Sequence, residues 1–106
     1  MDAVIKLISR TRTTDEYGVP RVNEVPREVF CQAYSVTRQE FFEGGRNGLN
    51  PSLVFKMFAP DYYGEEVIEY NGQRYGVYRT YYVPGEDYME VYVERKGGLN
   101  EEGNAG

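Results

Sequence analysis

The stretch that decides the fold is residues 66–83, EVIEYNGQRYGVYRTYYV. Asn71-Gly72 inside an alternating run is the strongest short-range signal for a two-residue β-hairpin, because both residues tolerate positive φ. Such a loop also fixes the register and places Glu69 opposite Arg74, a favourable cross-strand pair. We therefore predict a hairpin whose structural residues are Asn71, Gly72, Glu69 and Arg74. Its strands are residues 66–70 and 73–83.

Other strand-like runs lie on both sides of this hairpin. Residues 53–59 alternate cleanly between two faces, one of them apolar, as a strand with one core face does. The further strands that we predict are residues 3–8, 27–36, 53–59 and 88–94. Residues 9–26 are polar and contain Pro20 and Pro26, which cannot donate to a central ladder. We expect a long connection or a loose hairpin there.

One short helix is expected between the second and third strands. Thr37 and Glu40 have capping-box spacing, and Gly44-Gly45 offers a stop. The implied helix, residues 38–43, is far shorter than the roughly 12–15 residues that an isolated helix needs in water. Phe41 and Phe42 therefore dock on something, or the segment stays mobile. We expect residues 45–51 to be loop.

Together these elements predict an all-β fold, a small antiparallel β-barrel with one short helix and a long loop inserted between strands 2 and 3. The 106 residues suffice for one domain with a single small core. We expect that domain to occupy residues 1–96. A disordered, glycine-rich and acidic tail is expected over residues 97–106.

The composition argues against an enzyme. There is no histidine, and the single Cys31 has no base partner in the sequence, so Ser–His, Cys–His and most metal constellations are excluded. We expect no cofactor and no metal. Cys31 is expected to be a small buried hydrophobe. The acids of residues 61–66 are expected to be turn residues on a charged surface, namely Asp61, Glu65 and Glu66.

Charge and aromatic content point to a binding or structural role. The net charge is −5, which argues against a domain that grips nucleic acid by its phosphates. Arginines of residues 10–27 interleave with acids, which predicts a solvated face. Nine of the eleven tyrosines lie between Tyr62 and Tyr92, and they fit either an ordinary β core or a contact surface. One cysteine, no signal peptide and no apolar run of roughly 20 residues predict synthesis in the cytoplasm and no membrane span.

The order of motifs along the chain resembles that of the head-closure (head–tail joining, or stopper) proteins of long-tailed bacteriophages and prophages. In that family an EFF/EFY-x-x-G-x-x-GL segment precedes a VF strand, a D-Y-x-G-E turn, a Y-N-G-x-x-Y hairpin, an I/V-Y-R-T-Y strand and a final E-R-K-G-G. The corresponding positions are residues 40–42, 45, 48–49, 54–55, 61–65, 70–75, 77–81 and 94–98.

The resemblance implies a virion-assembly protein rather than a catalyst. Head-closure proteins form a homo-oligomeric ring beneath the portal and its adaptor, close the channel after DNA packaging, and present the surface to which the tail-completion or tail-terminator protein docks. Double-stranded DNA then passes through the lumen without specific binding. The implied location is the head–tail neck of the virion, after synthesis in the cytoplasm of a bacterial host.

The resemblance also implies a channel-gating loop that projects into the lumen of the ring. Its residues are Arg38, Gln39, Glu40, Phe41, Phe42, Glu43, Gly44, Gly45, Arg46, Asn47, Gly48 and Leu49. We expect the isolated protein to be largely monomeric and to form the ring only on the portal–adaptor template. The loop is expected to be unrestrained in the monomer, to become ordered in the ring, and to move aside for DNA. Alternatively, Phe41 and Phe42 are core residues that cover one end of the barrel.

Two alternative functions stay open from the sequence. One is a tail-completion component of the same phage neck. The other is a small nucleic-acid-binding barrel of OB or SH3 type, which needs a basic face with exposed aromatic residues.

Overall fold

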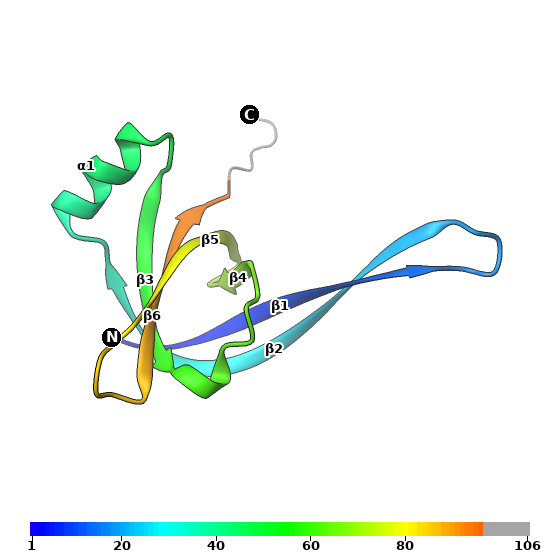
Figure 1. Ribbon diagram of the computed structural model, residues 1–106, viewed down its shortest axis with the longest axis horizontal. Helices are drawn as coiled ribbons and strands as arrows, with labels where there is room; N and C mark the ends of the chain where they lie inside the picture. Colours follow the sequence, from blue (N-terminus) through cyan, green and yellow to red (C-terminus); the bar gives the residue numbers. More distant parts are fainter. Residues whose placement is uncertain (97–106) are drawn as a thin grey trace.

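The computed structural model of the protein describes residues 1–96 (Figure 1). The predicted tail, residues 97–106, lies outside the described residues. In chain order the elements are β1 (Asp2–Thr14), β2 (Pro20–Ser35), α1 (Arg38–Arg46), β3 (Pro51–Phe58), the 3₁₀ helix η1 (Ala59–Asp61), β4 (Val67–Tyr70), β5 (Gln73–Tyr82) and β6 (Tyr88–Arg95).

The strands form one ring-like antiparallel sheet. Neighbours follow the order β1-β2-β3-β6-β5-β4, and β4 pairs back with β1. The prediction of an all-β fold with one short helix between the second and third strands is confirmed. In Figure 1 the helix lies above the sheet, and β1 and β2 leave the body together as a long ribbon.

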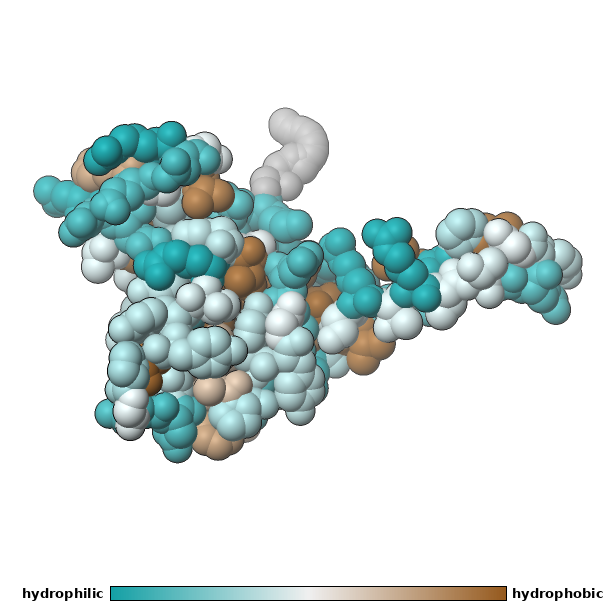
Figure 2. Space-filling model, in the orientation of Figure 1, coloured by the Kyte–Doolittle hydropathy of each residue, from teal (hydrophilic) through white to brown (hydrophobic). Residues whose placement is uncertain are grey.

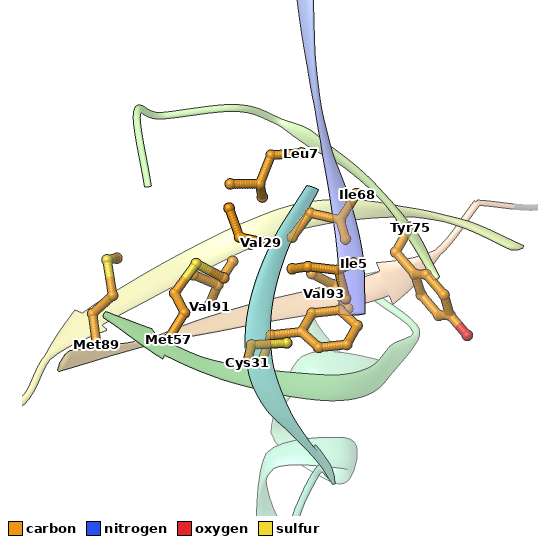
Figure 3. Packing of buried hydrophobic residues seen from close by; sticks show 11 residues of the cluster. Ile5, Leu7, Val29, Cys31, Met57, Ile68, Tyr75, Met89, Val91 and Val93 are labelled. Atoms are coloured by element: carbon orange, nitrogen blue, oxygen red, sulfur yellow. The ribbon is translucent and has the colours of Figure 1, made fainter. Parts of the chain in front are cut away.

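Apolar side chains from all six strands fill the interior of the ring (Figure 3). β6 contributes Met89, Val91 and Val93, all fully buried and all on one face. Phe55 is also fully buried, and the rings of Tyr70 and Tyr75 meet it edge-on at centroid distances of 5.4 and 6.2 Å. Some tyrosines therefore serve the core, as aromatic pairs of this geometry commonly do.

The β4–β5 hairpin has the predicted register, with Glu69 opposite Arg74 and Tyr70 opposite Gln73. Asn71 has a φ of 51° and Gly72 a φ of 75°. These left-handed values are the ones that a two-residue hairpin loop of type I′ requires.

Of the two alternatives predicted for residues 9–26, the structure shows the hairpin, and the long connection was wrong. The hairpin is not loose, because β1 and β2 stay paired from Asp2 opposite Gln32 to Thr14 opposite Pro20. Pro20 and Pro26 are compatible with this ribbon, since β3 pairs with β2 only from Gln32 onward and the prolines have one neighbouring strand instead of two. The ribbon formed by residues 9–25 is called the arm below.

The predicted end of the helix was also wrong. The helix continues through Gly44 and Gly45 to Arg46, and the left-handed residue that ends it is Gly48, with a φ of 79°. The amides of Asn47, Gly48 and Leu49 donate to carbonyls of the last turn, as in a glycine C-cap.

The two helical glycines differ in their surroundings, which gives a first test. A Cβ added to Gly44 would lie 2.4 Å from Pro51 Cγ, whereas one added to Gly45 would meet nothing within 4 Å. We predict that Gly45→Ala raises the free energy of unfolding by about 0.5–1 kcal/mol, because alanine loses less backbone entropy in a helix. Gly44→Ala should lower it by about 1–3 kcal/mol through overpacking. Urea unfolding of the matched pair measures both values, and equal shifts would contradict the contact with β3.

Candidate functional site

The segment predicted to gate a channel is mostly helical. Residues 38–46 form α1, and Asn47, Gly48 and Leu49 follow as its C-terminal turn. Thr37 Oγ1 accepts the Glu40 backbone amide at 3.1 Å, so the predicted N-cap is confirmed. The Glu40 carboxylate itself points to β5 instead of completing a reciprocal capping box.

Phe41 and Phe42 are exposed residues of this helix. Their exposed fractions are 46% and 59%, and neither belongs to the core cluster. The two rings meet edge-on at a centroid distance of 5.8 Å. The alternative that they cover one end of the sheet as core residues was therefore wrong. They form an apolar patch at the surface of the helix. Glu43 and Arg46 follow Phe42 by one and four residues in the same helix.

Hydrogen bonds from β5 to Glu40, together called the clasp below, tie the first turn of the helix to the sheet. The Glu40 carboxylate accepts from Arg79 Nη2 at 2.7 Å, from Arg79 Nε at 3.2 Å and from the Tyr78 hydroxyl at 2.5 Å. The Arg79 guanidinium lies over the Tyr92 ring, 3.6 Å from its centroid. Bidentate pairing and stacking fix the orientation of arginine in a way that lysine does not reproduce.

This arrangement sets the protonation behaviour of the clasp. Hydrogen bonds from Arg79, opposed by partial burial and assisted by Tyr78, lower the pKa of Glu40 below its ordinary value of 4.5. Burial and the Glu40 carboxylate raise the pKa of Tyr78. Both groups therefore keep one protonation state near neutral pH, and the clasp is a stable ion pair rather than an acid/base site.

The expectation of an unrestrained segment in the monomer was consequently wrong. The Glu40 clasp and the seat of Gly44 on Pro51 hold α1 in the single chain. Sequence reasoning missed Tyr78 and Arg79 as partners, because both lie about forty residues away and in a different element. The only signal was the acid at helix position 40 and an arginine in a tyrosine-rich strand.

The predicted pair Glu69 and Arg74 is present but weak. Their closest charged atoms are 3.8 Å apart. Arg74 instead binds Glu24 of the arm in a bidentate pair, at 2.9 and 2.8 Å, and Arg10 approaches the same carboxylate at 3.4 Å. This cluster braces the arm against the hairpin. It was not foreseen because residues 9–26 were predicted only as a long connection or a loose hairpin, without a register.

A second ion pair lies where the arm leaves the body. The Glu65 side chain is only 2% exposed, so its prediction as a surface turn acid was wrong. It accepts from Arg27 Nη2 at 2.7 Å and from the Tyr63 backbone amide at 2.8 Å. Arg27 also donates to the Asp61 carbonyl at 2.7 Å and lies over the Tyr63 ring at 3.9 Å.

The acidic side chains and Cys31 are the groups of residues 1–96 that bear on metal binding and thiol chemistry. Within residues 1–96 no three histidine, cysteine, aspartate or glutamate residues are grouped so that they could hold a metal ion. Cys31 is buried in the core as predicted, and burial raises the pKa of its thiol to about 11. A thiol with such a pKa is a poor nucleophile at neutral pH. No helix in this part of the chain is long and apolar enough to cross a membrane.

Comparison with known proteins adds no assignment. The sequence matches no family model, and no curated protein matches it.

The clasp makes a prediction for the dynamics of α1. Glu40→Gln should speed amide hydrogen exchange in α1 by roughly two- to fivefold, because a partly exposed ion pair is worth about 0.5–1 kcal/mol. The wild type should show the same faster exchange at low pH. The stabilisation from the clasp is complete above the ordinary glutamate pKa of 4.5, and it is lost as the pH falls from there through the lowered pKa of Glu40. The matched control is Glu43→Gln, whose carboxylate accepts from the Gln39 side-chain amide at 3.2 Å and makes no ion pair within residues 1–96. Equal exchange in the two variants would contradict the clasp.

The buried pair makes a prediction for stability. Arg27→Met should lower the free energy of unfolding by about 2–4 kcal/mol, because it leaves the Glu65 carboxylate buried with one donor. Arg12→Met in the same ribbon should leave stability nearly unchanged, since Arg12 is exposed and has no acidic partner among residues 1–96. Thermal unfolding of both variants decides the matter. A small loss for Arg27→Met would contradict the dependence of the buried Glu65 carboxylate on Arg27.

Proposed function

We propose that this chain is a head-closure protein of a long-tailed bacteriophage or prophage, built as a small β-barrel. Copies of it form a ring beneath the portal and adaptor, close the channel after the genome is packaged, and offer the docking surface for the tail. The resemblance in motif order is the starting point of this proposal, and two features of the structure support it.

The first and principal support is the helix between β2 and β3. It displays Phe41 and Phe42 to solvent outside the core, and its tie to β5 is a single carboxylate. An exposed aromatic pair on a short, weakly tied helix suits an element that packs against copies of itself and can be displaced. In a ring, Glu43 and Arg46 would repeat as charged rings beside the passing DNA.

The second support is that residues of the shared motifs form turns and hydrogen bonds that stabilise this fold. Asn71-Gly72 closes the hairpin, and Glu65 of the D-Y-x-G-E turn binds Arg27. Glu94 of the final motif accepts the Asn50 amide at 3.0 Å, which fixes the chain between the helix and β3. The shared motifs are therefore determinants of a fold, and they support a resemblance in architecture.

The gating step that follows from this arrangement is a release rather than an ordering of loose chain. In the monomer α1 lies on β3 and β5. Movement of the segment for DNA passage requires the Glu40 clasp on Arg79 and Tyr78 to open. Contacts between helices of neighbouring copies must offset that cost, which is small because the clasp is partly exposed.

A phage that encodes this chain provides the test. With a stop codon in the gene, we expect tailless heads that have lost their DNA, together with free complete tails, in electron micrographs of the lysate. Purified protein added to the lysate should restore infectivity. Filled, sealed heads that carry an incomplete tail would assign the chain to tail completion instead.

The exposed phenylalanines make the gating role testable by substitution. Phe42→Ser should leave the unfolding temperature unchanged, because the side chain is 59% exposed, yet heads closed with it should leak DNA nearly as the stop-codon phage does. Tyr82→Ser is the control, as Tyr82 is 63% exposed on β5. DNA retention equal to that of the control would remove Phe42 from the gate.

A further inference from the structure

The arm ends in a rigid turn that displays apolar side chains. Asp15 Oδ1 accepts the backbone amides of Tyr17 and Val19, each at 2.9 Å, and Asp15 Oδ2 accepts Arg21 Nε at 3.2 Å. Gly18 supplies the left-handed φ of 78° that the turn requires. Tyr17 is 83% exposed and Val19 48% exposed. A fixed aromatic side chain at a tip loses little entropy on binding and suits an interface anchor.

Past the brace at Glu24, the arm has no third strand beside it. Beyond Ile8 on β1 and before Gln32 on β2, the two strands pair only with each other. Isolated two-stranded ribbons are marginally stable in water. Val22 and Val25 add apolar surface and are each 54% exposed. The space-filling view shows the arm extending from the body with apolar residues set among polar ones (Figure 2). Binding of another surface to the arm would bury these apolar side chains and stabilise the ribbon.

The body carries an open apolar hollow of about 640 Å³. Phe30, Phe58 and Tyr88 line it, with Cys31 and Met57 at its base. Phe30 is 81% exposed and Phe58 48% exposed, so a large aromatic surface faces solvent here. A concave apolar site with a few polar groups at its rim is the usual form of a docking site.

Both surfaces carry charges of both signs, and these can pair across a contact. Lys56 lines the hollow, and Glu16 lies at the tip of the arm. Asp2 and Asp87 stand at the rim of the hollow, and neither makes an ion pair within residues 1–96. Arg12 lies opposite Val22 on the arm and likewise has no ion-pair partner in this part of the chain. Rim charges of opposite sign favour encounter and fix register.

Their positions require two molecules. The hollow is bordered by the N-terminus and the turn between β5 and β6, which lie at the end of the molecule opposite to the tip of the arm (Figure 1). The molecule is 49 Å long, and the paired strands of the arm cannot fold back across that length. A knob and a hollow on opposite ends give a head-to-tail contact, which generates rings when the rotation closes.

We propose that the tip of the arm of one copy, anchored by Tyr17, seats in the hollow formed by Phe30, Phe58 and Tyr88 of the next copy. This contact rests on the head-closure proposal for its biological setting, where it is the lateral contact of the ring. As a contact between two copies of the chain it stands by itself and is measured on purified protein.

A photo-crosslinking amino acid placed at Val19 tests the contact in the full-length chain. Mixing light and heavy-isotope-labelled protein at high concentration and irradiating it should give a crosslinked dimer with one chain of each label. Peptide mapping should place the second end at the hollow. Absence of the dimer up to the solubility limit, or a second end elsewhere on the body, would overturn the proposal.

Matched variants show which side chains carry the contact. Tyr17→Ala and Phe30→Ser should each lower the dimer yield at least several-fold without changing the unfolding temperature, because both side chains are exposed. Tyr82→Ala, a substitution at a similarly exposed tyrosine on β5, should leave the yield unchanged. Equal yields in all three variants would contradict a seat in the hollow.

The two proposals fail in different ways. If the crosslink maps to the hollow but a phage with the stop codon still retains its DNA, the contact stands and head closure is wrong. If the phage needs the chain for closure but the purified protein gives no crosslink, head closure stands and the seat of the arm is wrong.

Discussion

The ion pair between Arg27 and Glu65 joins β2 to the connection between β3 and β4, and the closure of the sheet depends on it. A carboxylate that is only 2% exposed is tolerated because a guanidinium at 2.7 Å and a backbone amide at 2.8 Å satisfy it. The same arginine binds the Asp61 carbonyl, so one side chain of β2 fixes the connection between β3 and β4. β4 has four residues and closes the sheet by pairing with β1. Closure therefore depends on a connection that this pair positions, and the arm begins at the same arginine.

The clasp at Glu40 differs from this pair in its surroundings and therefore in its cost of opening. Arg79 is 44% exposed, and water can replace its bonds to Glu40 when they break. Opening the buried pair instead strands a charge in the protein interior. Opening the closed sheet therefore costs more free energy than releasing α1 from β5. A protein that must remain folded while one segment moves needs this separation of energies.

The sequence was informative where the chemistry is local and silent where it depends on distant partners. Asn71-Gly72 specified both the turn and its register, because a two-residue loop leaves no other choice. Thr37 marked the start of the helix because an N-cap hydrogen bond joins residues only three positions apart. Gly44 and Gly45 were misread as a stop: glycine is permitted in a helix, and its close approach to Pro51 is visible only in three dimensions. The arm was predicted only as a long connection or a loose hairpin. Its strands are polar and exposed, so hydrophobic alternation, which reports burial, gives no signal there. Glu65 was predicted to be a surface acid because its partner Arg27 is 38 residues away in the sequence.

The brace on Glu24 connects these features to assembly. Arg74 of the hairpin and Arg10 of the arm grip one carboxylate, so the arm leaves the body in a set direction. In a head-to-tail contact the rotation from one copy to the next follows from that direction relative to the hollow, and the rotation decides between a closed ring and an open filament. A flexible arm would sample many rotations and would lose entropy on seating. The bidentate pair at the base of the arm and the hydrogen-bonded turn at its tip remove that freedom in advance. If the proposed contact forms, the arm therefore binds as a rigid element, and the folded monomer sets the rotation between neighbouring copies.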